Sequence, residues 1–153
     1  MKTLILYATK YGAAKEIAER IGGKIDGAVI CELNQKNIPP LADFDNVIIG
    51  SSVYAVAIRK EAKLFAANHA DELSKKTLGL FLSNFADDEG YFDKNFPEKV
   101  VGAAKVKACL GGIFDPSKAN FIERFIIKIV MKETRYVARL DDAKIDKFVA
   151  DLL

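Results

Sequence analysis

The fold is decided by the stretch TLILYATKYGAAKEIA, residues 3–18. Residues 3–8 form a continuous apolar run, which is typical of a strand covered on both faces in a parallel sheet. A short loop with a hydroxyl and a glycine follows, and then apolar residues recur at helical spacing until a Gly22-Gly23 pair, a signal for the end of a helix. The stretch therefore predicts a strand–loop–helix unit, which is the repeating unit of α/β folds.

Four more apolar runs follow along the chain, at residues 29–33, 46–51, 77–83 and 106–111. Helical periodicity occupies residues 60–73, lies between residues 91 and 103, and returns at residues 142–153. Between residues 33 and 46 there is room only for a turn near Pro39-Pro40. This alternation predicts an α/β fold, a doubly wound parallel sheet of five strands with right-handed crossovers.

Composition excludes several classes of protein. The 23 basic and 21 acidic side chains give a net charge of +2, so charge does not call for nucleic acid as a partner. A single histidine excludes a His-rich metal centre, and the two cysteines, Cys31 and Cys109, are expected to be buried small residues that do not pair. No apolar run approaches the roughly 20 residues that span a bilayer or forms the core of a signal peptide. We expect a single cytoplasmic domain spanning residues 1–153.

One segment is surplus to the five-strand plan. Asp115-Pro116 is a helix-start signal, and residues 116–132 combine a wide apolar face with a basic stripe. The sequence predicts an extra helix here, after the fifth strand. Two interpretations remain open: the apolar face packs on the domain, or it makes a peripheral contact with a membrane surface or partner and gives access to a quinone.

Chemistry is expected where the strands end, because ligands of open parallel sheets bind at the carboxyl ends of the strands. The loop 9–15 leads into a helix N-terminus and is a candidate anion site; the alternative is a plain turn with a flexible glycine. It matches neither the GxGxxG dinucleotide fingerprint nor the GxxxxGK[ST] triphosphate loop. Tyr54 and Phe85 follow two neighbouring strands and would suit a flat ring. Ordinary partial burial of loop aromatics explains each of them better when taken singly, and explains them less well if both line one crevice.

These residues resemble a known family. TKYGAAKEIA at residues 9–18 resembles the phosphate loop and first helix of flavodoxins, and VIIGSSVY at residues 47–54 resembles their third strand and first ring-binding loop. FIERFIIKIVMK at residues 121–132 resembles the extra helix of flavodoxin-domain proteins related to menaquinone-linked protoporphyrinogen dehydrogenase. The resemblance implies a flavodoxin-like sheet of order 2-1-3-4-5 with an extra helix after strand 5.

The resemblance also implies FMN as the cofactor, with no metal and no catalytic side chain, because the flavin carries the electron chemistry. The residues that it assigns to the FMN phosphate are Thr9, Lys10, Tyr11, Gly12, Ala13, Ala14 and Lys15. The residues that it assigns to the isoalloxazine ring are Ser52, Val53 and Tyr54 on one side and Asn84, Phe85 and Ala86 on the other.

Three departures from the family pattern qualify the function. Ala14 stands where the phosphate loop usually has a hydroxyl, the ring loop has no glycine, and the segment after the fourth strand is short and begins acidic. We expect an FMN-dependent oxidoreductase that passes electrons between an organic substrate or partner protein and an acceptor such as a quinone. A one-electron carrier flavodoxin, or a binding module of the same fold whose flavin site has decayed, remain alternatives. The sequence leaves the oligomeric state open.

Overall fold

The computed structural model describes residues 1–54, 56–84, 88–114 and 137–153. Five strands run parallel in one central sheet, in the order β2-β1-β3-β5-β6. They are β1 (Thr3–Ala8), β2 (Val29–Glu32), β3 (Asn46–Tyr54), β5 (Thr77–Ser83) and β6 (Ala104–Cys109). This confirms the predicted α/β fold and the order 2-1-3-4-5. The predicted extra helix 116–132 lies outside the described residues.

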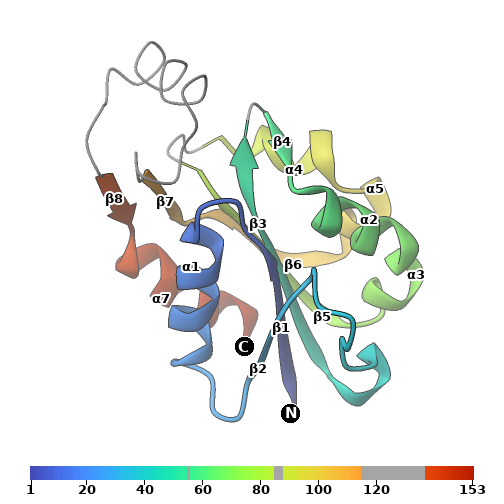
Figure 1. Ribbon diagram of the computed structural model, residues 1–153. Helices are drawn as coiled ribbons and strands as arrows, with labels where there is room; N and C mark the ends of the chain where they lie inside the picture. The colour runs from blue at the N-terminus through green and yellow to red at the C-terminus, as the bar shows by residue number, and fades with distance from the viewer. Residues whose placement is uncertain (55, 85–87, 115–136) are drawn as a thin grey trace.

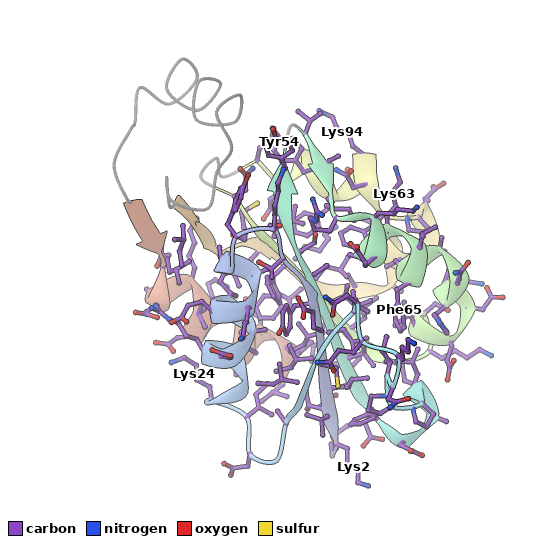
Figure 2. The ribbon with its side chains drawn as sticks, in the orientation of Figure 1. Lys2, Lys24, Tyr54, Lys63, Phe65 and Lys94 are labelled. Carbon is purple, nitrogen blue, oxygen red and sulfur yellow. The ribbon has the colours of Figure 1, made fainter. Side chains whose placement is uncertain are left out.

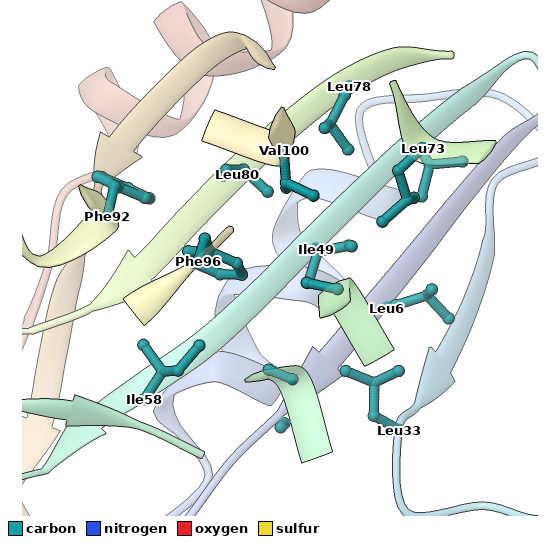
Figure 3. Close-up of a cluster of buried hydrophobic side chains, with 14 of the residues drawn as sticks. Leu6, Leu33, Ile49, Ile58, Leu73, Leu78, Leu80, Phe92, Phe96 and Val100 are labelled. Carbon is teal, nitrogen blue, oxygen red and sulfur yellow. The ribbon is translucent and has the colours of Figure 1, made fainter. Parts of the chain in front are cut away.

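Helices cover both faces of the sheet (Figure 1). One face carries α1 (Ala13–Gly22) and α7 (Asp142–Leu152). The other carries α2 (Lys60–Asn68), α3 (Ala70–Leu73), α4 (Gly90–Asn95) and α5 (Glu98–Ala103). Alternate strand residues point to the two layers, so Ile5 and Ile48 pack toward α1 and α7 while Leu6 and Ile49 pack toward the other helices. Figure 3 shows the second of these cores.

Two predicted helices are each divided into two. The helix expected at residues 60–73 is interrupted at His69, whose ring lies against that of Phe65 with the ring centroids 4.3 Å apart and the planes tilted by 30°. The helix expected between residues 91 and 103 is interrupted at Phe96, which is extended (φ −105°, ψ 151°). Because Pro97 follows, Phe96 is forced out of the helical region and α5 must start anew. The short second connection holds only a 3-10 turn, Leu41–Asp43, as expected.

The edge strands are less covered than the sequence predicts. All six residues of β1 are buried, whereas Val29 and Ile30 in β2 are 38% and 36% exposed. β2 lies at the sheet edge, and its connection to β3 contains nothing longer than the three-residue turn to cover it. Coverage on both faces therefore holds for the central strands only. Cys31 and Cys109 lie on the two opposite edge strands and are both free thiols, as expected. Cys109 is buried, whereas Cys31 is only half-buried, because it lies in the poorly covered edge strand β2.

Two additional pairings lie at the carboxyl end of the sheet. β3 continues three residues past its predicted end because Val53 and Tyr54 pair antiparallel with the short strand β4 (Ala57–Ile58). The predicted ring loop is therefore the tip of a β-hairpin. The fifth strand ends at Cys109, and β7 (Gly111–Phe114) is a separate strand that pairs antiparallel with β8 (Val137–Leu140).

Candidate functional site

The connection from β1 to α1 is a tight turn made by Gly12. Its backbone is left-handed (φ 99°, ψ −6°), a conformation that is open to glycine and strained for other residues. The Gly12 N–H donates to Thr9 Oγ1 at 2.8 Å, and the Gly12 carbonyl accepts from the Glu16 N–H at 3.0 Å. The Thr9 hydroxyl accepts this bond, so its own proton remains to donate to a ligand.

Three backbone donors at the start of α1 form the centre of this site. The N–H groups of Ala13, Ala14 and Lys15 precede the first intrahelical bond and have no partner within the helix. No side chain caps α1, and the described residues supply no acceptor for these three N–H groups. A helix N-terminus also carries partial positive charge, so the arrangement favours an anion such as a phosphate.

Ala13 and Ala14, the two residues of the loop that lack the expected hydroxyl, are both buried. Ala13 is 4% exposed and Ala14 is fully buried, where it packs with Ile17 in the core beneath α1. Lys15 is exposed. An anion bound at this loop would therefore be held by backbone N–H groups and the Thr9 hydroxyl.

Ser51 and Ser52 connect the neighbouring strand to this loop. Ser52 Oγ accepts from the Lys10 N–H at 3.1 Å, and Ser51 Oγ accepts from the Arg59 N–H at 2.9 Å while donating to the Ser52 carbonyl. Both serines are buried. The Ser52 hydroxyl, predicted to flank a ring, is thus a link between the end of β3 and the β1–α1 loop.

The aromatic side of the site lies at the tip of β3. Val53 and Tyr54 are half-buried, and Figure 2 shows Tyr54 at the end of the sheet opposite Lys2. The Lys10 ammonium lies 3.5 Å from the centroid of the Tyr54 ring and 5.4 Å from that of Tyr11, which are cation–π distances. The structure therefore places Lys10 of the β1–α1 loop over the ring of Tyr54, the aromatic residue predicted to flank the flavin.

Asn84 provides a buried donor at the end of β5. Its N–H donates to the Gly111 carbonyl at 3.0 Å, which joins β5 to β7. Its side-chain Nδ2 is buried and has no hydrogen-bond partner among the described residues. Because a buried amide donor normally has an acceptor, a ligand carbonyl would satisfy it. Phe85 and Ala86, predicted beside Asn84, lie outside the described residues.

Two residues around the site were not anticipated from the sequence. Asn95, at the end of α4, is buried and hydrogen-bonded to the β3–β4 hairpin, and Val56 in that hairpin has a positive φ of 67°. The one available signal for Asn95 was a polar residue two positions before Pro97, where a helix has to end. Beneath the site, burial raises the pKa of the Tyr7 phenol, and the nearby Glu32 carboxylate raises it further.

Two other kinds of feature were sought in the described part of the chain. No three His, Cys, Asp or Glu side chains are grouped there in a way that could hold a metal ion. No helix within the same ranges has the length and apolar character needed to span a bilayer.

Comparison with known families places the chain. Residues 4–141 match the family model described as a flavodoxin domain. The chain belongs to the flavodoxin domain family. The matched residues include the β1–α1 loop and the five parallel strands of the sheet, so the family match covers the whole candidate site of this flavodoxin-domain protein.

Individual relatives are distant. Protoporphyrinogen IX dehydrogenase [quinone] of Escherichia coli K12 is 24% identical over 146 residues, covering 86% of this chain and 80% of the relative. A flavoprotein from Lactobacillus acidophilus NCFM, solved in complex with FMN, superposes with a TM-score of 0.54 at 19% identity, over 72% of this chain and 91% of the other. The two-electron reduced flavodoxin of Megasphaera elsdenii gives a TM-score of 0.59 at 16% identity, over 70% and 84%. These solved structures share the fold.

Proposed function

We propose that this flavodoxin-domain protein binds FMN at the carboxyl end of its sheet. We further propose that it is an oxidoreductase passing electrons between an organic substrate or partner protein and an acceptor such as a quinone. The observation that carries the proposal is the start of α1, where the N–H groups of Ala13, Ala14 and Lys15 have no partner among the described residues and lie beside the Thr9 hydroxyl. Three adjacent donors at a positive helix end suit a phosphate group.

The phosphate would be held mainly by these donors. Each hydrogen bond to a charged group contributes about 1.5–3 kcal/mol, so three N–H groups and one hydroxyl suffice without a hydroxyl at position 14. Gly12 keeps the turn open for them through its left-handed backbone. Lys10 and Lys15 add positive charge on either side of the turn.

The ring would lie beside the tips of β3 and β5. Tyr54 and Val53 offer half-buried apolar surface, and Asn84 Nδ2 offers the buried donor that a ring carbonyl would satisfy. Phe85 and Ala86 complete the ring side in the proposal on sequence grounds. Bound FMN supplies reversible uptake of electrons and protons. Lys10, held to β3 through Ser52, places a cation at the ring side, and a nearby positive charge favours a reduced flavin that carries negative charge.

A titration of the apo-protein with FMN, followed by quenching of flavin fluorescence, tests the proposal. We expect saturable one-to-one binding, weakened about tenfold to a hundredfold by Thr9→Val through loss of one hydrogen bond to a charged acceptor. Thr3→Val is the matched control, because Thr3 is a buried threonine at the start of β1, whereas Thr9 follows the end of that strand. Absence of binding at high micromolar FMN would refute the cofactor and leave a binding module of the same fold.

The choice of donor and acceptor needs a second experiment. The name of the Escherichia coli relative makes protoporphyrinogen IX and a quinone the first pair to try, with menadione as a soluble quinone. Rapid two-electron reoxidation of the reduced protein by menadione would support the oxidoreductase. Accumulation of a one-electron-reduced form during photoreduction would instead support a carrier that exchanges electrons with a partner protein. A peripheral membrane contact through residues 116–132 belongs to the same proposal.

A further inference from the structure

The hairpin between β3 and β4 contains a strained residue. Tyr54 pairs with Ala57, so only residues 55 and 56 connect the two strands. The commonest two-residue hairpin turns have a positive φ at one or both central residues, which is why asparagine and glycine predominate there. Val56 adopts φ 67° and is the one non-glycine residue with positive φ among those the structure describes. A β-branched residue in this region is an outlier, which persists when its surroundings enforce it.

The side chain of Val56 does not enforce this conformation. It is 61% exposed and belongs to neither of the two hydrophobic cores formed by the described residues. Its carbonyl, in contrast, accepts a hydrogen bond from Asn95 Nδ2 at 3.1 Å. Two features therefore hold Val56 in this conformation: the tight two-residue connection and the hydrogen bond from Asn95 at the end of α4.

Asn95 uses its whole amide group in this contact. Nδ2 also donates to the Tyr91 carbonyl at 2.9 Å, and Oδ1 accepts from the Ile58 N–H at 3.2 Å. The side chain is 6% exposed, and Ile58 packs in the same core as Phe96, the residue after Asn95 (Figure 3). The buried amide of Asn95 thus bonds to the backbone of Val56, just before β4, and of Ile58, within β4. It also bonds to the backbone of its own helix at Tyr91.

We infer that Asn95 is a positioning residue for flavin binding, which fixes Val56 in the left-handed conformation and thereby sets the hairpin tip that carries Tyr54. The inference rests on the proposed function, since the role of the tip is to flank the ring. A glycine would adopt this positive φ without strain, whereas Val56 adopts it while its carbonyl is bonded to the buried Asn95 side chain.

Loss of the amide releases the strain. Without Asn95, Val56 can return to a negative φ, and the hairpin tip then has to be ordered again when FMN binds. Such ordering lowers affinity without removing any contact to the ligand. We expect Asn95→Ala to raise the Kd for FMN about tenfold, and Asn95→Asp to do the same because the carboxylate keeps an acceptor for Ile58 but loses both donors.

A rescue distinguishes positioning from general destabilisation. Val56→Gly removes the steric cost of positive φ, so the Asn95→Ala/Val56→Gly double variant should recover most of the FMN affinity. Asn46→Ala is the matched control: Asn46 is a buried asparagine at the other end of β3, where Nδ2 donates to Thr3 Oγ1 at 3.1 Å. This control should leave the Kd within about twofold of the wild type, below the roughly tenfold change expected from the hairpin.

Three results would overturn the inference: unchanged FMN affinity in both Asn95 variants, an equal loss in Asn46→Ala, or no recovery in the double variant. A measurement on the apo-protein keeps the inference separate from the cofactor proposal. In the wild type, the amide and Hα protons of Val56 should give the strong intraresidue NOE of a positive φ. This NOE should weaken in Asn95→Ala and persist in Asn46→Ala, whether or not FMN binds. An NOE that is unaffected by Asn95→Ala would refute the positioning role.

Discussion

Replacing Gly50 with alanine should destabilise the protein strongly. Gly50 lies in the middle of β3, opposite Tyr7 of β1 and Phe81 of β5. A Cβ built on Gly50 would lie 1.9 Å from Phe81 Cζ and about as close to two further ring carbons, at 2.1 and 2.2 Å. Non-bonded carbon atoms normally approach to about 3.5–4.0 Å, so the ring would have to move by well over 1 Å.

The surroundings leave little space for that movement. Phe81 is fully buried, and its ring meets Phe148 edge to face at a centroid distance of 6.3 Å. Overpacking of a core costs about 1–3 kcal/mol, and the size of this overlap places Gly50→Ala near the upper value. The gain from replacing a strand glycine, about 0.5–1 kcal/mol, offsets only part of this cost.

Urea unfolding measures the effect as a change in midpoint at constant slope. Gly102→Ala is the matched control, because a Cβ there meets no atom within 4 Å and should stabilise α5 by up to about 1 kcal/mol. Phe81→Leu should relieve the overlap, so the Gly50→Ala/Phe81→Leu variant should be more stable than the two single changes predict, by about 0.5–3 kcal/mol. A Gly50→Ala protein within about 0.5 kcal/mol of the wild type would refute the packing argument.

Three further predictions concern the site and its surroundings. Thr9→Val should lower the urea midpoint of the apo-protein as well as FMN affinity, since the Gly12 N–H loses its acceptor at a cost of about 1–3 kcal/mol; an unchanged midpoint would contradict the loop geometry. Ser52→Ala should weaken FMN binding by about tenfold or less, because the neutral bond from the Lys10 N–H is worth about 0.5–1.5 kcal/mol, and fluorescence titration beside the wild type checks this. Because the raised pKa of Tyr7 means that the folded state holds the phenol proton more tightly than the unfolded state, stability should fall as pH rises above about 10, and Tyr7→Phe should remove part of that fall in urea midpoints compared between about pH 9 and pH 11.

The sequence predicted the sheet well because its signals are local. Continuous apolar runs mark strands buried on both faces, and β1 and β5 begin and end at the predicted residues. The same signal misled at β2, where Val29 and Ile30 read as core but lie at an uncovered edge. An apolar run indicates that a segment forms a strand. Whether both faces of that strand are buried depends on which connections of the fold contain helices to cover them.

The site was predictable only where one segment builds it. The β1–α1 turn follows from a glycine before a helix, and in the structure Gly12 is the left-handed residue directly before α1. The bond from the Lys10 N–H to Ser52 Oγ joins residues 42 positions apart, and Asn95 reaches Val56 across 39. Such long-range hydrogen bonds depend on strand register and helix packing, which no local pattern encodes.

The antiparallel pair β7–β8 closes the base of the chain segment between residues 114 and 137. Phe114 and Val137 are paired, so the two ends of the intervening segment are held side by side by the ribbon. The Asp141 N–H donates to the Leu110 carbonyl, and Asp141 caps α7 through the Lys144 N–H, so α7 is anchored by residues on the sheet side of that ribbon. Loop-closure entropy changes slowly with length, by about 0.6 kcal/mol for each doubling. A change in the length of the chain between residues 114 and 137 should therefore alter the entropy of closing that loop only slightly, because β7 and β8 already hold its two ends together.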